Sequence, residues 1–314
     1  MNKDHRNVYG RDVISTLSST YQQLYVPPGR EGEKQYDEIV KCGRDAASRD
    51  LSHFHTHEKD SLVYEVTPAG SVGVVTLFER EDFVTFLRIM ANRCTMAEIP
   101  DTQGAALLDG VINWDKIRAH KKKYISEEIE KGSFFPDWDS EFVRFISDKE
   151  NYKDALIVLS VGPYSGVSAE SMNRLLLRSG QGDEKSRTVS EEEWLSLSDT
   201  IRRYHECTHF ICRRKFADQK DAVWDELVAD AAGISAAFHR FDPRMEELFL
   251  GIENGRYTGG RLENYVSDPQ LDKMAARITS VLGSFESLIA DNPGAGPYET
   301  AVMLEENQSR MWSW

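Results

Sequence analysis

The sequence predicts an α+β protein that is mainly helical, with a small sheet in its N-terminal half. Residues 61–79 have the composition of two strands around a turn, and 154–163 form a short apolar run of strand type. Beyond residue 167 nearly every segment has helical spacing instead. A chain of 314 residues can bury a large core. We therefore expect an α+β region over 1–166, to which no role is assigned, and a helical region over 167–314, as two domains or as parts of one.

The N-terminal elements are bounded by turn residues. Helical spacing stops at Pro27-Pro28-Gly29, because proline cannot continue a helix. Thr67-Pro68-Ala69-Gly70 is a turn signal between two strands. The apolar run 154–163 is typical of a strand buried on both faces. The elements expected here are a helix over 9–25, a strand hairpin over 61–79, a helix over 80–94 and a strand over 154–163.

The C-terminal half is predicted as a series of helices. Ser190 and Glu193 have the spacing of a capping box, which marks the start of one helix. Asp221 is a suitable N-cap for the next. The polar stretch 177–190 predicts a mobile loop. The expected helices are 168–179, 191–214, 222–239, 242–254, 269–290 and 297–310.

The charge of the chain argues against two classes of partner. Its formal net charge is −14, and such a surface repels nucleic-acid phosphates and anionic lipids. One basic run, residues 116–124, departs from this balance. Acidic residues follow it at 126–132, so we interpret the run as the solvated face of a helix. We expect neither nucleic-acid nor membrane binding.

The cysteines and the N-terminus indicate a reduced, cytoplasmic protein. No stretch approaches the ~18 apolar residues that a membrane-spanning helix needs. The N-terminal residues lack the apolar segment of a secretory signal. The cysteines show no spacing typical of a disulfide scaffold, so free thiols are expected. They are Cys42, Cys94, Cys207 and Cys212.

The sequence His205-Glu206-Cys207-Thr208-His209 is the strongest functional signal. Residues four apart lie on one face of a helix, so both imidazoles can reach a single ion. Glu206 projects beside the first histidine, where it can accept a proton from metal-bound water without binding the metal itself. The pattern therefore predicts two metal ligands and a general base.

Glu226 is the expected third ligand. From His209 the first helix rises about 9 Å to Lys215, and the second rises about 7.5 Å from Asp221 to Glu226. In an antiparallel pair Glu226 thus returns nearly level with His209. Asp230 lies one turn further, where it can accept a hydrogen bond from a ligand histidine. Asp225 and Asp230 are rival ligands, but Asp225 is rotated by ~100° and Asp230 lies one turn away.

HECTH followed by DELVAD resembles the gluzincin pattern of zinc metallopeptidases, in particular a bacterial branch with HECTH and DELxAD. The resemblance covers roughly residues 190–238. It implies a catalytic helix pair with one zinc ion per chain. Carried over, it makes His205, His209 and Glu226 the ligands, Glu206 the base and Asp230 the carboxylate behind a ligand histidine.

Two further stretches contain candidate residues. His53, His55 and His57 alternate and could share one strand face, but their polar surroundings favour a solvated segment. Residues 253–266 combine glycines with cationic and phenolic side chains, so a donor for a developing oxyanion is expected there. Arg261 and Tyr265 are the candidates, one turn apart if a helix follows Gly260, and Tyr257 and His239 compete with them. In the alternative interpretation Tyr265 is a core residue and Arg261 a surface ion-pair partner.

Together these observations predict a zinc-dependent hydrolase of metallopeptidase type. Metal-activated water would attack a peptide or other amide bond, with Glu206 as base and Arg261 or Tyr265 assisting the carbonyl. The expected partner is a peptide or small amide substrate. The main alternative is a non-catalytic, zinc-stabilised protein whose N-terminal half binds a partner. A third interpretation is an interaction protein that binds no metal. In that case the positions of Glu226 and Asp230 relative to the two histidines are a coincidence.

Overall fold

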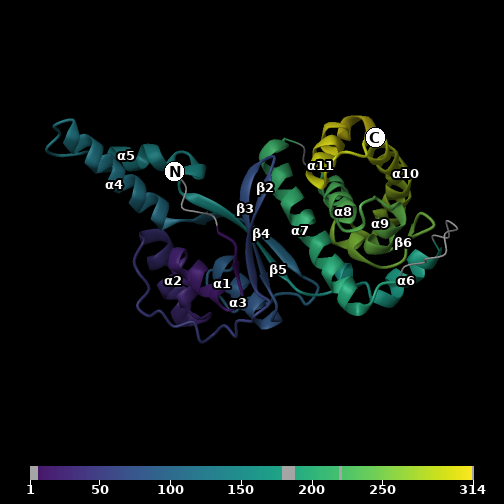
Figure 1. The fold of residues 1–314 in the computed structure, drawn as a ribbon, viewed down its shortest axis with the longest axis horizontal. Helices are drawn as coiled ribbons and strands as arrows, with labels where there is room; N and C mark the ends of the chain where they lie inside the picture. The colour runs from purple at the N-terminus through teal and green to yellow at the C-terminus, as the bar shows by residue number, and fades with distance from the viewer. Residues whose placement is uncertain (1–5, 179–187, 219–220, 313–314) are drawn as a thin grey trace. The chain divides into compact units, whose positions relative to one another are not determined.

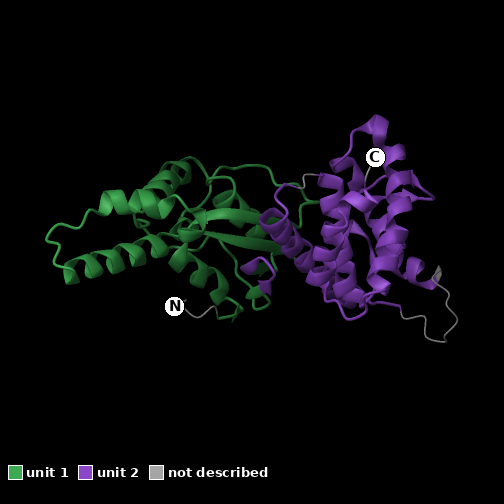
Figure 2. Ribbon diagram, turned by 90° about the horizontal axis from the view of Figure 1, so that it is seen from above, with its two compact units in different colours: residues 1–65, 72–160 green, residues 66–71, 161–314 purple. Residues whose placement is uncertain are grey.

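The computed structural model describes residues 6–178, 188–218 and 221–312. The chain divides into two compact units, the first comprising residues 1–65 and 72–160 and the second residues 66–71 and 161–314 (Figure 2). The structure divides the chain after residue 160, whereas the sequence predicts a boundary after residue 166. Most of the predicted loop 177–190 lies outside the described residues. The fold is α+β and mainly helical, as predicted.

The first unit is built on a five-stranded mixed sheet of order β1-β2-β3-β5-β4. β3 pairs with β5 in parallel, whereas β4 pairs with β5 antiparallel. β5 is the apolar strand that the sequence predicts, and its second half, from Leu156 to Ser160, is buried. The strands are β1 (Val8–Tyr9), β2 (Ser61–Thr67), β3 (Gly70–Leu77), β4 (Ala105–Ile112) and β5 (Lys153–Ser160).

Helices α1 (Asp12–Thr20), α2 (Arg30–Cys42) and α3 (Arg80–Met90) complete the core of this unit (Figure 1). Val13 and Phe86 are among their fully buried side chains. The helix predicted over 9–25 is broken at Tyr21, after which a short 3-10 turn follows. The helix predicted over 80–94 ends earlier, because Arg93 and Cys94 adopt left-handed backbone conformations. α2 and β4 were not predicted.

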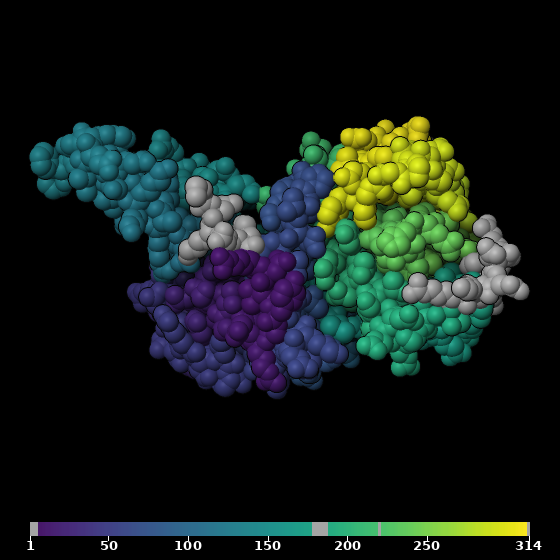
Figure 3. Space-filling model, viewed as in Figure 1, coloured from purple at the N-terminus to yellow at the C-terminus, as the bar shows by residue number. Residues whose placement is uncertain are grey.

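Helices α4 (Trp114–Glu130) and α5 (Trp138–Ile146) form a hairpin that extends away from the sheet (Figures 1 and 3). The predicted basic run lies on α4, and Lys121, Lys122 and Lys123 are exposed there. The turn between the helices contains Phe134 and Phe135, each 92% exposed. The interpretation of this run as a solvated helix face is consistent with these positions.

From residue 161 onward, the described part of the second unit is mainly helical, with one small hairpin. The predicted helix 242–254 ends early, because Gly251 adopts a left-handed conformation (φ 75°) and Ile252 enters a strand. The helix expected after Gly260 is a single 3-10 turn. The helices and strands of the second unit after residue 160 are α6 (Ala169–Arg178), α7 (Glu191–Lys215), α8 (Ala222–Phe238), α9 (Pro243–Leu250), β6 (Ile252–Glu253), β7 (Arg256–Tyr257), α10 (Leu271–Ala290), α11 (Pro297–Glu306) and α12 (Gln308–Met311). Within the described ranges no helix has the length and apolarity needed to cross a bilayer.

α7 and α8 form the antiparallel pair that positions the candidate site. α7 begins with the predicted capping box between Ser190 and Glu193, and Asp221 caps α8 through two backbone N–H groups. The two helices are closely packed at Gly233. A Cβ atom on Gly233 would lie 2.6 Å from the carbonyl oxygen of Ile201, so no larger residue fits without displacing the backbone.

We predict that Gly233→Ala destabilises the protein by about 1–3 kcal/mol, because the added methyl group overpacks the interface of α7 and α8. Urea denaturation followed by circular dichroism measures the loss. Gly283→Ala is the matched control, since Gly283 lies on the exposed face of α10 with no neighbour within 4 Å. The control should be stabilising by about 0.5–1 kcal/mol through helix propensity. Equal effects of the two substitutions would contradict the packing argument.

Candidate metal centre

Two histidines of α7 and one glutamate of α8 meet at the interface of the two helices. The Nε2 atoms of His205 and His209 lie 2.9 Å apart. Glu226 Oε1 lies 3.3 Å from Nε2 of His209, and its Oε2 lies 3.5 Å from Nε2 of His205. Both histidines are buried and Glu226 is half-buried. The three side chains form a group that could hold a metal ion.

Each imidazole is oriented by a second carboxylate on its other nitrogen. Nδ1 of His205 lies 2.6 Å from Asp230 Oδ1, and Nδ1 of His209 lies 2.9 Å from Asp225 Oδ2. A carboxylate at Nδ1 fixes the proton there and directs the Nε2 lone pair away from it, as in most histidine metal sites. Asp230 thus lies where the sequence predicted it. Asp225, which the sequence offers as a rival ligand, contacts Nδ1 of His209 instead.

The electrostatics of the group fit a cation. With their Nδ1 atoms bonded to carboxylates, the two Nε2 lone pairs face each other unless a proton or a metal ion separates them. Oε2 of Glu226 is buried and makes no hydrogen bond to any described residue. Burial would raise the pKa of Glu226, but the hydrogen bond from His209 and the charges of both imidazoles hold it well below its usual value. A ligand set of two histidines and one glutamate is typical of zinc sites with an open position.

A tyrosine and an arginine from distant segments support Asp230. The Tyr164 hydroxyl donates to Asp230 Oδ1 at 2.5 Å and lies 2.9 Å from His205 Nδ1. The Arg261 guanidinium donates to Tyr164 at 2.8 Å and forms a close ion pair with Asp230 Oδ2. Asp230 itself is fully buried, so these partners compensate for its lost hydration. The sequence analysis does not identify Tyr164, which lies in a short 3-10 turn between β5 and α6.

The other predicted catalytic residues lie near the group in different environments. Glu206 is half-buried on α7 beside His205 and interacts electrostatically with the buried guanidinium of Arg202, one turn earlier on the helix. Arg261 is directed to Asp230 and Tyr164, so its charge is already paired. Burial raises the pKa of Tyr265, the charge of Arg261 lowers it, and the charges of Glu226 and Asp230 raise it.

The competing candidates lie elsewhere. The Tyr257 hydroxyl bonds to Gly260 and Glu263 instead of the site. In the first unit, the segment of His53, His55 and His57 is held by structural contacts, since Nε2 of His53 bonds to a backbone carbonyl and the ring of His57 stacks on Phe78. Asp82, which is fully buried, accepts the backbone N–H of His55.

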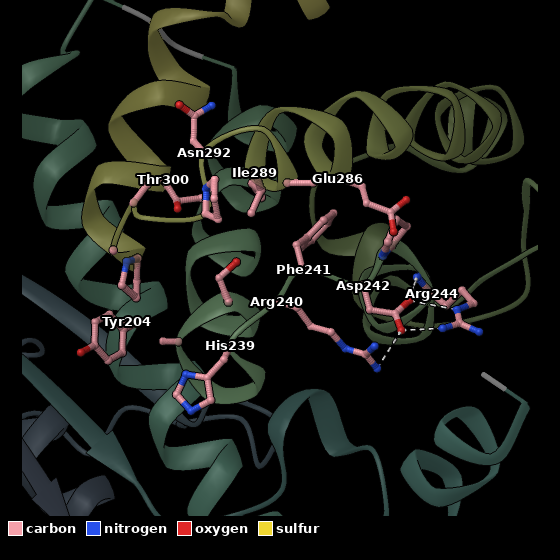
Figure 4. Close-up of a pocket in the computed structure, with 18 residues that line it drawn as sticks. Tyr204, His239, Arg240, Phe241, Asp242, Arg244, Glu286, Ile289, Asn292 and Thr300 are labelled. Carbon is pink, nitrogen blue, oxygen red and sulfur yellow. Dashed lines mark hydrogen bonds and ion pairs between the residues drawn. The ribbon is translucent and has the colours of Figure 1, made fainter. Parts of the chain in front are cut away.

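His239 lines a cavity of about 1020 Å³ in the second unit, shown in Figure 4. Tyr204 of α7 also lines it, but none of the three candidate ligands does. Arg244 is bound to Asp242 through two nitrogen atoms, the closer at 2.6 Å, and Arg240 lies 4.0 Å from the same carboxylate (Figure 4). The cavity is therefore separate from the metal-ligand group.

A model of a family of unknown function, DUF7005, matches residues 4–287. The chain belongs to this family. Neither a curated protein nor a solved structure matches it. The matched region includes all three candidate ligands and the residues at both Nδ1 atoms, whereas Glu305 of α11 lies beyond it.

We predict that Tyr164→Phe weakens zinc binding by about tenfold to a hundredfold without unfolding the protein, because Asp230 loses a partner that fixes the orientation of His205. A competition titration with a chromogenic chelator measures the affinity. Tyr257→Phe is the matched control, since it removes a hydroxyl outside this network. Equal affinity of the Tyr164→Phe and wild-type proteins would show that the hydroxyl does not support the site.

When no metal is bound, the raised pKa of His209 keeps a second proton on its imidazole, at Nε2. A metal ion that binds at Nε2 would displace this proton. Burial alone would lower its pKa, but hydrogen bonds to Asp225 and Glu226 and the charges of these carboxylates raise it well above the usual value. We therefore expect zinc binding to release about one proton at pH 7 and its affinity to increase with pH up to the raised pKa. Calorimetric titrations in two buffers of different ionisation enthalpy measure this release, and identical heats would contradict it.

Proposed function

We propose that the protein is a zinc-dependent hydrolase of metallopeptidase type that acts on a peptide or other amide bond. The observation that carries this proposal is the cluster of His205, His209 and Glu226, with a carboxylate on Nδ1 of each histidine. Glu206 follows the first of these histidines on α7 and is half-buried beside it. A site with only a structural role has no need of such a carboxylate.

His205, His209 and Glu226 would hold one zinc ion per chain. Zinc bound in this way supplies Lewis-acid chemistry, polarising a substrate carbonyl and lowering the pKa of water to about 7. The carboxylate of Glu206 accepts the proton of the attacking water and passes it to the leaving amine.

The remaining residues position these groups or assist them. Asp230 orients His205 and is fixed in turn by Tyr164 and Arg261. Of the two candidates for stabilising a developing oxyanion, Tyr265 is favoured, because the charge of Arg261 is paired with Asp230. Arg261 acts as a positioning residue.

Support for the gluzincin resemblance comes from the pairing between α7 and α8. The first histidine of HECTH contacts the aspartate four residues after the glutamate, which is the role that the resemblance implies for Asp230. The glutamate itself lies level with the second histidine. The proposed substrate class, a peptide or small amide, rests on this resemblance and on the chemistry of the ligand set.

The proposal predicts different results for two glutamate variants. Glu226→Ala should lose most of its zinc, because one ligand is removed, whereas Glu206→Gln should retain one zinc per chain. Glu206→Gln should also lose activity by a factor of about 100 to 10,000, the usual contribution of a general base. Metal content is measured by mass spectrometry on protein purified without added metal, and activity with a mixed peptide library.

Two results would overturn parts of the proposal. A wild-type protein that contains no zinc and takes up none on titration would exclude the zinc hydrolase. Full activity of Glu206→Gln would exclude Glu206 as the base. If zinc binds but no library peptide is cleaved, melting temperatures with and without chelator become decisive, because a purely structural site should lose much of its stability with the ion.

A further inference from the structure

We propose that the second unit contains a second divalent-cation site, formed by Cys212 of α7, Asp225 of α8 and Glu305 of α11. One ligand atom from each of these residues lies within 4.8 Å of the other two. The Sγ atom of Cys212 lies 3.4 Å from Oε1 of Glu305. This site is distinct from the group of His205, His209 and Glu226, and it does not depend on whether that group is catalytic.

Burial of the cluster, and a Glu305 carboxylate that no described lysine or arginine pairs with, indicate a ligand here. Glu305 is 3% exposed and Cys212 is 7% exposed. Glu305 forms no ion pair with a lysine or arginine among the described residues, whereas Asp225 is already paired with the imidazole of His209. A thiol is only a weak hydrogen-bond donor, so it compensates poorly for a buried carboxylate. A bound cation would balance the charge of the Glu305 carboxylate.

Asp225 has an oxygen atom available for this role. Its Oδ2 accepts the hydrogen bond from Nδ1 of His209. Its Oδ1 is buried and has no hydrogen-bond partner among the described residues. A buried carboxylate oxygen without a donor is unfavourable unless an ion or a water molecule occupies the space beside it. The same side chain can thus orient His209 with one oxygen and bind a cation with the other.

The ligand chemistry selects the class of ion. A cysteine thiolate is a soft ligand, which favours zinc and related transition-metal ions over magnesium or calcium. The thiol of Cys212 must lose its proton when the ion binds, since the thiolate is the ligand. One thiolate and two carboxylates carry three negative charges, which a divalent ion largely balances.

The test is a titration of the metal-free, full-length protein with Co²⁺. A thiolate bound to Co²⁺ gives an intense charge-transfer absorption in the near ultraviolet, whereas histidine and carboxylate ligands do not. We expect two Co²⁺ ions per chain, with this absorption arising from one of them. All proteins carry Cys42→Ser, because Cys42 is the exposed thiol and would bind metal at the surface.

The variants assign the absorption. Cys212→Ser and Glu305→Gln should each reduce the stoichiometry from two ions to one, and Cys212→Ser should abolish the absorption. Cys207→Ser is the matched control, a buried cysteine of the same helix outside the cluster, and should leave both unchanged. Because Glu305→Gln is nearly isosteric, it provides the same test if Cys212→Ser does not fold.

The possible outcomes separate this site from the zinc site of the proposed function. Glu226→Ala should lose one ion and keep the thiolate absorption. If the Co²⁺–thiolate absorption develops but no ion binds to His205, His209 and Glu226, the second site is supported and the proposed function is refuted. A wild-type protein that binds one ion without the absorption, or a Cys212→Ser protein that retains it, would overturn the second site.

Discussion

The arrangement of the candidate site depends on the close packing of α7 against α8. At Gly233 the backbone of one helix touches the carbonyl of Ile201 on the other, and this contact fixes their separation and register. Moving along the pair from that contact, Asp230 meets His205, and Asp225 and Glu226 meet His209. A shift by one helical turn would break all of these pairs together. The metal-ligand group is therefore a consequence of helix packing.

The interior around these helices also has an unusual balance of charge. Three carboxylates, from Asp225, Glu226 and Asp230, face two imidazoles, and Arg261 pairs with Asp230. Buried carboxylates need cations or hydrogen-bond donors close by. In the metal-free protein the protonated imidazole of His209 supplies part of this charge. A metal ion bound by the same side chains would take over that role.

Much of the site could be predicted because its information is local. Helical periodicity placed both histidines on one face, and the length of the connection between the helices brought Glu226 level with His209. Tyr164 could not be found in this way, since it precedes its partner Asp230 by 66 residues and lies in an irregular segment. The sequence indicates Arg261 as a residue of the site, but its ion pair with Asp230 depends on the tertiary fold. Boundaries failed where residues such as Tyr21 and Gly251 depart from helical geometry.

The short distance along the chain between the ligands has a consequence for folding. His205, His209 and Glu226 belong to one helical hairpin, and helical hairpins form faster than structures that require distant segments to meet. Tyr164 and Arg261 join through contacts of much longer sequence separation. The ligands can therefore come together on a partly folded chain, before the residues that orient them are in place. An ion captured at that stage would stabilise the hairpin and guide the rest of the unit to pack around it.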